Sequence, residues 1–439
     1  MRGNQLNSIF YMLIVVIGLL VAISWLPDFS VFGYQFKKPE LFSELRPDET
    51  KPIALDSNRN TKIATPKIVV RKRGSKAIEE FGPSNLSHFF EAIGHAKNSP
   101  VRIAFFGDSF IEGDILCGPF RDTLQRVFGG SGVGYVPITS EVTKFRTSIQ
   151  HDFLNWKTYS IVGHKSAYAP LGLPGFCFKP KDANEVAYRP AKQNFVMAKF
   201  FYESDYPFTM SSTLNDSTLL RLDFGASQGV SEYVFSHHGL SSLKVSFPQH
   251  DSLRLYGAAF EDSIGISVDN FAMRSNPGMG LLLIGQERMK QFNSLRGYKL
   301  IILQYGLNVL SEKDTTGYIW YLDKMTLLIR KLKENFPAAG FLLISVGDRS
   351  SNQHGKLATM PDIPVMRDLQ RRIAQKSGIA FWDMFEAMGG ENSMVKYTES
   401  QPPLAAKDYT HLTFRGGRKL AKKLADALLK EKAKYERKK

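Results

Sequence analysis

The second half of the chain alternates between short apolar runs and longer amphipathic segments, and this alternation restricts the possible folds more than any other feature. Apolar runs of strand length lie at 299–305, 340–346 and 379–383, and helical periodicity fills 319–335 and 365–377 between them. Strands separated by a helix run parallel, and right-handed crossovers place helices on the faces of their sheet. The sequence therefore predicts a three-layer α/β/α sandwich around a parallel sheet.

A similar unit near residue 100 carries the first candidate catalytic side chain. The apolar run 101–106 is followed by Gly107-Asp108-Ser109, and apolar residues at helical spacing follow from Leu116 to about residue 127. A strand, a turn and a helix in this order place a serine at the carboxyl end of a parallel strand. The N-terminus of the helix is then expected beside it, with its partial positive charge. Such tripeptides are also common in turns without any catalytic role.

A second polar residue follows the strand at 299–305, in Gly306-Leu307-Asn308. An asparagine after a strand is most often a turn residue that bonds to its own backbone. Its functional alternative is a side-chain donor that points at an oxyanion forming in a transition state.

A third candidate group lies near the C-terminus, where Asp408-Tyr409-Thr410-His411 precedes a helical segment. Three-residue spacing allows one short segment to bring a carboxylate and an imidazole to the same site. The aspartate can then orient the histidine, and the histidine can take the proton of a serine. Asp-x-x-His also occurs widely as a surface pair.

Taken together, Gly-Asp-Ser, Gly-x-Asn and Asp-x-x-His in this order resemble the SGNH/GDSL hydrolase superfamily, whose sandwich is flavodoxin-like. The resemblance implies that Ser109 is the nucleophile, His411 the general base and Asp408 its orienting partner. It also implies an oxyanion hole that includes Asn308 and the backbone N–H of Ser109. The reaction implied by the resemblance requires no metal and no organic cofactor.

The block between these motifs departs from the family pattern. The family has a glycine whose N–H completes the oxyanion hole, and the matching position here falls at or near Ser275. A serine keeps the N–H but loses the freedom of glycine at positive φ. The neighbouring Arg274 is either a structural ion-pair partner or a contact for an acidic substrate group. Asp108, Arg274 and Gly306 are the candidate substrate-binding residues.

About 140 residues separate the first helix from the Ser275 block, and short β-like runs separated by turns fill much of this stretch. We expect an inserted all-β sandwich with carbohydrate binding as its candidate role, as in the SGNH branch that deacetylates peptidoglycan or other cell-envelope glycans. Aromatic residues of the insert, such as Trp156, Tyr159 and Tyr206, either stack on sugar rings or belong to its core. The expected divisions are an N-terminal membrane anchor (1–30), a polar tether (31–75), the hydrolase domain in two parts (76–149 and 258–439), and the insert (150–257).

The anchor is expected from an uncharged apolar run at 9–26, which is long enough to cross the hydrocarbon core. A cleavable signal peptide has a shorter apolar stretch and a small-x-small cleavage site, and neither is evident here. The charges that flank the run are nearly balanced and do not decide its orientation. The family resemblance places the catalytic domain on the extracytoplasmic, periplasmic side.

The formal net charge of +15 raises the question of an acidic partner. The Lys and Arg residues are spread along the chain instead of forming one stripe, so no nucleic-acid partner is expected. The two cysteines, Cys117 and Cys177, form no zinc motif, and they are either paired or buried as free thiols.

The expected activity is that of an esterase that removes acyl groups, mainly O-acetyl groups, from a cell-envelope or other polysaccharide. One alternative keeps the same residues and passes the acyl group from a membrane acyltransferase partner to a polysaccharide. Another alternative is a glycan-binding protein that retains the fold without catalysis. The expected partners are thus an acylated polysaccharide and, through the N-terminal helix, the membrane.

Overall fold

The computed structural model describes residues 30–31, 34–35, 77–82, 85–142, 145–162, 170–191, 195–248, 252–311 and 317–438. The chain divides into two compact units, 1–70 and 71–439. The described part of the first unit is an antiparallel pair, β1 (Ser30–Val31) and β2 (Tyr34–Gln35). The predicted anchor run at 9–26 lies outside the described residues, as does nearly all of the predicted tether. Among the helices that are described, none has the length and apolar character needed to span a bilayer.

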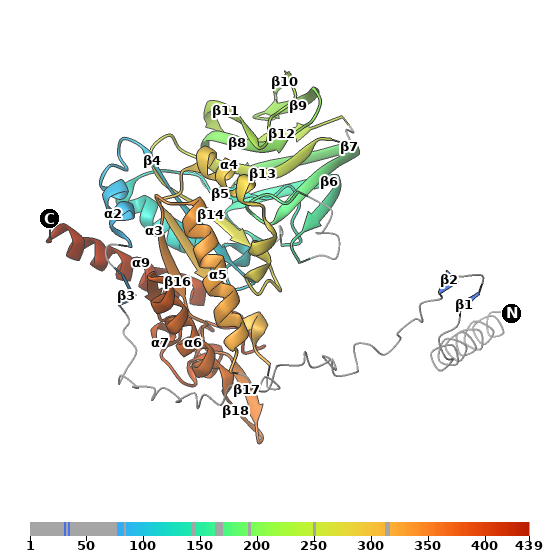
Figure 1. Cartoon of the computed structure of the whole chain (residues 1–439). Helices are drawn as coiled ribbons and strands as arrows, with labels where there is room; N and C mark the ends of the chain where they lie inside the picture. The colour runs from blue at the N-terminus through green and yellow to red at the C-terminus, as the bar shows by residue number, and fades with distance from the viewer. Residues whose placement is uncertain are drawn as a thin grey trace. The chain divides into compact units, whose positions relative to one another are not determined.

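The second unit contains a six-stranded sheet whose first five strands run parallel, as the strand–helix alternation predicts (Figure 1). Its last strand pairs antiparallel with its neighbour and closes one edge. Each of the four central apolar runs is almost completely buried, because helices cover both faces of such a sheet. In spatial order the strands are β14 (Gly265–Ala272), β4 (Pro100–Gly107), β15 (Leu300–Gln304), β16 (Gly340–Ile344), β19 (Ala380–Trp382) and β3 (Ile78–Glu80).

The helices form two groups, which follow from the order of the strands. The chain moves from β4 outward to β14 and then back across β4 to β15, so right-handed crossovers place the intervening helices on opposite faces. One group contains α2 (Ser87–Gly94), α3 (Cys117–Phe128), α7 (Met384–Met388) and α9 (Phe414–Glu436). The other contains α4 (Gln286–Arg296), α5 (Ile319–Asn335) and α6 (Asp362–Ser377). The short α8 (Ser393–Glu399) contacts the hairpin of β17 (Ser350–Gln353) and β18 (Lys356–Thr359).

A second sheet, entirely antiparallel, is formed mainly by the stretch predicted to be all-β. Strand β7 is long enough to pair with β6, β12 and β13, and the sheet encloses its own apolar core, separate from that of the parallel sheet. Its nine strands are β5 (Gly134–Val136), β6 (Ile149–Ser160), β7 (Phe176–Pro190), β8 (Phe195–Glu203), β9 (Phe208–Leu214), β10 (Thr218–Phe224), β11 (Ser231–Leu240), β12 (Leu243–Ser246) and β13 (Arg254–Glu261).

The two sheets are joined by buried charges at the point where the chain passes from β13 to β14. Glu261, the last residue of β13, is fully buried and accepts hydrogen bonds from Arg102 of β4. Arg296 of α4 lies 2.9 Å from both Glu261 and Asp269 of β14. Only residues 262–264 separate the two strands. The antiparallel sheet is thus fixed to the parallel sheet by ion pairs as well as by the chain.

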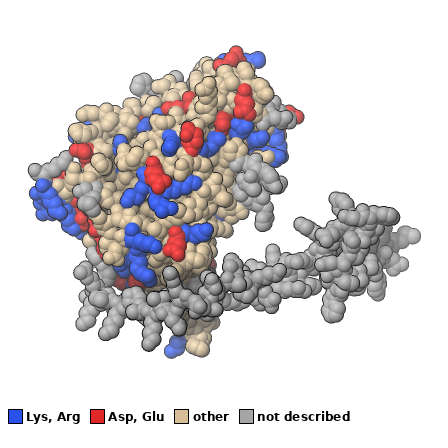
Figure 2. Space-filling model, in the orientation of Figure 1, with Lys and Arg blue, Asp and Glu red and all other residues tan. Residues whose placement is uncertain are grey.

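The surface carries both signs of charge. On the face shown in Figure 2, Lys and Arg side chains are interspersed with Asp and Glu and do not gather into a single stripe. Both cysteines are buried as free thiols.

Candidate active site

The register of three neighbouring strands brings the first candidate residues to one edge of the parallel sheet. Gly107 of β4 lies between Ala272 of β14 and Gln304 of β15. The chain therefore leaves the sheet at the same level in all three strands, just before Asp108-Ser109, Arg274-Ser275 and Gly306-Leu307-Asn308. Ligand sites of open α/β sheets lie at this carboxyl edge.

The structure brings Ser109, His411 and Asp408 together in one hydrogen-bonded series. The hydroxyl oxygen of Ser109 lies 3.1 Å from Nε2 of His411, and Nδ1 of His411 lies 2.6 Å from Oδ2 of Asp408. Both distances are within hydrogen-bonding range. Residues separated by about 300 positions in sequence thus have the geometry in which a base contacts a nucleophile and a carboxylate orients the base.

A turn stabilised by Asp408 itself explains the three-residue spacing. Its Oδ1 accepts hydrogen bonds from the backbone N–H groups of Thr410 and His411, which leaves Oδ2 for the imidazole. Burial alone would raise the pKa of Asp408, but these N–H groups and the imidazole together hold that pKa below its usual value. The carbonyl of Tyr409 accepts from the N–H of Ser350, so the β17–β18 hairpin holds this turn.

The segment after Ser109 differs from the prediction. We expected a helix N-terminus beside the serine, but α3 begins only at Cys117. A turn closed by the N–H of Ile111 and the carbonyl of Asp108 comes first, followed by the short 3-10 helix η2 (Glu112–Asp114). The dipole of α3 therefore does not act directly at Ser109, because its effect falls off within the first turn.

A buried carboxylate holds this segment in place. Asp114 lies 2.8 Å from Arg121 and 3.2 Å from Arg146. It also accepts hydrogen bonds from Ser148 at 2.6 Å and from Asn270 at 2.8 Å. Burial opposes the charged form, but the two guanidinium groups outweigh it and hold the pKa of Asp114 well below its usual value. This cluster was not identified from the sequence, because its members lie far apart along the chain.

The predicted oxyanion donor, Asn308, is exposed and lies in the short 3-10 helix η6 (Leu307–Val309). Its Nδ2 lies 3.2 Å from Oδ2 of Asp108 and 3.4 Å from the carbonyl of Asn276. Asp108 thus contacts the side chain of Asn308 and, through Oδ1, the N–H of Phe110. We infer that Asp108 orients Asn308 instead of contacting substrate, because its carboxylate is completely buried.

Replacing Asp108 by asparagine is expected to change the pH dependence of stability. Burial raises the pKa of Asp108 from 3.8 to about 7, although the N–H of Phe110 and the nearby His411 act in the opposite direction. A carboxyl with a raised pKa in the folded state favours folding at low pH, and this contribution is lost as the pH rises from about 4 to 7. The loss is at most about 4 kcal/mol for a shift of this size.

Urea unfolding at pH 4.5 and at pH 7.5 checks this expectation. The unfolding free energy of the wild type should fall relative to that of Asp108→Asn between the two pH values. Parallel behaviour of the two proteins would instead mean that the hydrogen bonds from Phe110 and Asn308 keep the carboxylate at its ordinary pKa.

The block with the missing glycine retains the backbone conformation that glycine favours. Ser275 has a φ of 58°, in the left-handed region that non-glycine residues seldom occupy. The expected loss of this conformation was therefore wrong. Arg274 forms a bidentate ion pair with Glu112, with contacts between 2.8 and 3.3 Å, which agrees with the structural alternative for this residue.

Gly306 has no side chain that could contact a substrate, and its role lies in the conformation of the backbone. Its φ is 122°, and a Cβ atom there would lie 2.7 Å from Nε2 of Gln370 and 2.8 Å from Cγ1 of Val346. The glycine thus allows the chain to turn between β15 and η6, which sets the position of Asn308. Two aspartates that follow strands of the parallel sheet have structural roles: Asp348 accepts from the backbone N–H of Met394, and Asp383 accepts from that of Glu386.

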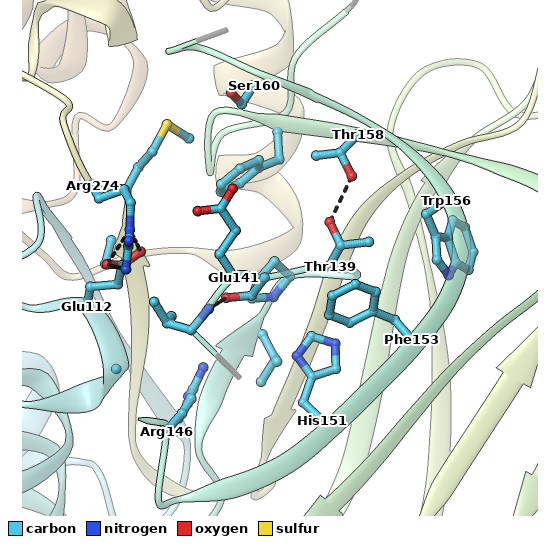
Figure 3. A pocket seen from close by; sticks show the side chains of 18 of the residues that line it. Glu112, Thr139, Glu141, Arg146, His151, Phe153, Trp156, Thr158, Ser160 and Arg274 are labelled. Atoms are coloured by element: carbon cyan, nitrogen blue, oxygen red, sulfur yellow. Dashed lines mark hydrogen bonds and ion pairs between the residues drawn. The ribbon is translucent and has the colours of Figure 1, made fainter. Parts of the chain in front are cut away.

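A cavity of about 800 Å³ adjoins this edge of the sheet and extends over the antiparallel sheet (Figure 3). One end is formed by Glu112, Arg274 and Ser275, close to the segment that carries Ser109. Trp156 lines the cavity but is mostly buried, and its Nε1–H donates to the carbonyl of Glu185. Further lining residues that the sequence did not single out are Thr139, Glu141, His151, Phe153, Thr158 and Ser160.

No metal site is evident in the part of the chain that the structure describes. Among those residues, no group of three or more His, Cys, Asp or Glu side chains is placed to bind an ion.

Comparisons with known proteins agree with the fold described above. No protein-family model matches the chain, and the search of curated proteins found no match. Solved structures do match. A peptidoglycan O-acetylesterase superposes with a TM-score of 0.67 at 20% sequence identity, over 81% of this chain and 99% of that protein. The chain therefore has the fold of the SGNH/GDSL hydrolases. More particularly, its fold is that of the peptidoglycan O-acetylesterase, along nearly the whole length of that protein.

Two further structures align less well. A putative GDSL-like lipase from Parabacteroides merdae has a TM-score of 0.28 at 13% identity, over 37% of this chain and 72% of its own. A family two carbohydrate esterase from Clostridium thermocellum, in complex with cellohexaose, has a TM-score of 0.27 at 11% identity, over 64% of this chain and 100% of its own. Scores at this level carry no inference about the present chain.

Proposed function

We propose that this protein is a serine esterase that removes O-acetyl groups from a polysaccharide of the cell envelope. The observation that carries this proposal is the series formed by Ser109, His411 and Asp408 at the carboxyl edge of the parallel sheet. The fold shared with a peptidoglycan O-acetylesterase supports the class of substrate.

The proposed reaction is acyl transfer in two steps. Nε2 of His411 takes the hydroxyl proton of Ser109 as Oγ attacks the ester carbonyl carbon, and the carbonyl oxygen becomes an oxyanion. The imidazolium then gives that proton to the alcohol oxygen of the polysaccharide, the ester C–O bond breaks, and an acyl-enzyme forms. A water molecule then attacks the acyl carbon while His411 again acts as the base. The acyl-enzyme breaks down to acetate and free Ser109.

Three donors are proposed to stabilise the oxyanion: the backbone N–H of Ser109, the backbone N–H of Ser275 and the side chain of Asn308. The side-chain nitrogen of Asn308 contacts Asp108 and Asn276 in the free protein. One of its two hydrogens must therefore turn toward the substrate when the oxyanion forms. Catalytic hydrogen bonds are often long before substrate binds and shorten in the transition state.

Hydrolysis is favoured over transfer to a second polysaccharide, because water has access to the catalytic residues. The side chains of His411 and Asp408 are 44% and 48% exposed. A transferase must protect its acyl-enzyme from water, and exclusion of water depends on closure of the site.

A direct test follows acetate release from O-acetylated polysaccharide by the purified full-length protein. Active-site labelling with a fluorophosphonate provides a second readout, since the label should attach to the wild type and not to Ser109→Ala. Acetate release without any added acceptor supports the esterase. Acetyl transfer to an added glycan with little free acetate would favour the transferase, and neither reaction together with no labelling would contradict both.

We further propose that the apolar run at 9–26 anchors the protein in a membrane with the catalytic domain on the periplasmic side. The length of the run and the nature of the proposed substrate support this placement. Fractionation of cells followed by protease treatment of intact spheroplasts tests it, because only an extracytoplasmic domain is then digested.

A further inference from the structure

The cavity beside the candidate active site has two walls that come from different parts of the fold. The loop around Thr139 and strands β6 and β7 form one wall, and the end of β14 with Glu112 forms the other. Its volume of about 800 Å³ lies within the range of small-molecule sites, which is about 300–1,000 Å³. The cavity can therefore hold more than a single acetyl group.

Strand β6 presents apolar side chains to solvent at this cavity. Phe153 is 40% exposed and the next residue, Leu154, is 57% exposed. A β-bulge follows at once, where Asn155 has a φ of 57° and its side-chain nitrogen donates to the carbonyls of Asp182 and Ala183. Bulges re-aim side chains and are frequent near binding sites.

Hydroxyl groups lie beside these apolar side chains. The hydroxyls of Thr139 and Thr158 are 2.8 Å apart, and Figure 3 shows the two side chains pointing toward each other in the part of the cavity that also contains Phe153. Ser140 and Ser160 add two more hydroxyls to the lining. A sugar ring has an apolar C–H face and a hydroxylated edge, so it matches a wall that combines an aromatic ring with hydroxyls.

Most of the charged side chains that line the cavity are paired. Glu112 is paired with Arg274, and Arg146 shares the buried Asp114 with Arg121. The other two charged side chains of the lining, Glu141 and Lys181, have opposite signs. With most of its charges paired, the cavity has no strong field of one sign that would select a nucleic acid or a strongly charged peptide.

We infer that this cavity binds an uncharged stretch of polysaccharide chain, next to the sugar whose ester lies at Ser109. The inference rests on the proposed function. It means that the cavity recognises the length of the polysaccharide chain. Glu112 connects the two places, because it is three residues from Ser109 and forms one end of the cavity. An oligosaccharide should therefore be a better substrate than a small acetyl ester, and Phe153 should contribute to the difference.

The test uses the full-length protein with Ser109→Ala, so that no turnover occurs, and two neutral probes, chitotetraose and xylotetraose, each beside its monosaccharide. At least one tetramer should bind more tightly than its monomer, and adding Phe153→Ala should weaken tetramer binding about tenfold, the loss of one stacking contact. Leu219→Ala is the matched control, because Leu219 lies in the same sheet, is 74% exposed and is outside the cavity. It should leave binding unchanged.

The outcomes separate this inference from the proposed function. Failure of both tetramers to bind, or equal binding with and without Phe153, overturns the inference. Circular dichroism and urea unfolding should be the same with and without Phe153→Ala, which shows that the variant is folded. Hydrolysis of p-nitrophenyl acetate by the wild type tests the proposed esterase separately. Absence of hydrolysis by the wild type would contradict the proposed esterase while leaving the binding result to decide the cavity.

Discussion

Replacing Ser109 by alanine should lower kcat/KM for an acetyl ester by about four to six orders of magnitude, the range seen when a triad nucleophile is removed. The reason is that no acyl-enzyme can form without Oγ, which lies 3.1 Å from Nε2 of His411. Residual hydrolysis would then come from the oxyanion donors and from binding alone. The measurement is hydrolysis of p-nitrophenyl acetate by the full-length wild type and variant, with folding checked by circular dichroism.

Ser217→Ala is the matched control, because Ser217 is an exposed serine in the turn between β9 and β10. It should retain full activity. If Ser109→Ala instead keeps most of the wild-type rate, Ser109 is not the nucleophile and the proposed reaction is wrong. Loss of activity in both variants would show that the assay reports on folding.

The second large effect concerns stability. Asp114→Asn should lower the free energy of unfolding by about 3–5 kcal/mol, the range measured when one partner of a buried ion pair is removed. The substitution leaves Arg121 and Arg146 without their counter-charge. The amide nitrogen of asparagine would also face a donor, since Ser148 and Asn270 both donate to the carboxylate. Asparagine tolerates the positive φ of 63° at this position, so backbone strain does not complicate the result.

Urea unfolding measures this effect, and Asp216→Asn serves as the comparison. Asp216 pairs with Arg189 at the same distance of 2.8 Å, but both side chains are largely exposed. Its loss should therefore cost less than about 1 kcal/mol. Equal destabilisation by the two substitutions would contradict the view that burial makes the Asp114 cluster important. Because the segment 109–116 carries the nucleophile, Asp114→Asn should also reduce activity at temperatures where it remains folded.

The sequence predicted the parallel sheet well, because its strands are continuous apolar runs and its helices have a strong period. The expected helix at 319–335 coincides with α5, and the expected strands at 340–346 and 379–383 contain β16 and β19. The prediction was wrong for the segment between Ser109 and the start of α3. The spacing from Leu116 onward suggested a helix beside Ser109, whereas the turn and the 3-10 helix before α3 depend on hydrogen bonds to distant residues such as Asn270.

The candidate site also combines residues that the sequence indicates with contacts that only the fold shows. Motifs with short spacing can be recognised, so the sequence indicates Ser109, Asn308, Asp408 and His411 as candidates. The contact between Asp108 and Asn308 joins residues 200 positions apart, and no pattern indicates it. The Glu112–Arg274 pair and the two-walled cavity likewise exist only because separate elements meet in the fold. For Ser275, the sequence identified the unusual residue but not that a serine keeps the left-handed backbone.

The junction between β13 and β14 has a consequence for how this architecture can be altered. Glu261 belongs to the antiparallel sheet, yet its partners Arg102 and Arg296 belong to the parallel sheet and its helices. Excision of the antiparallel sheet, or its replacement by an unrelated domain, would remove the carboxylate partner of Arg102 and one of the two carboxylate partners of Arg296, which is almost completely buried. The β-rich part is therefore not an interchangeable module. An engineered graft of another sugar-recognising domain would have to supply a carboxylate at the position of Glu261 to preserve the fold of the hydrolase part.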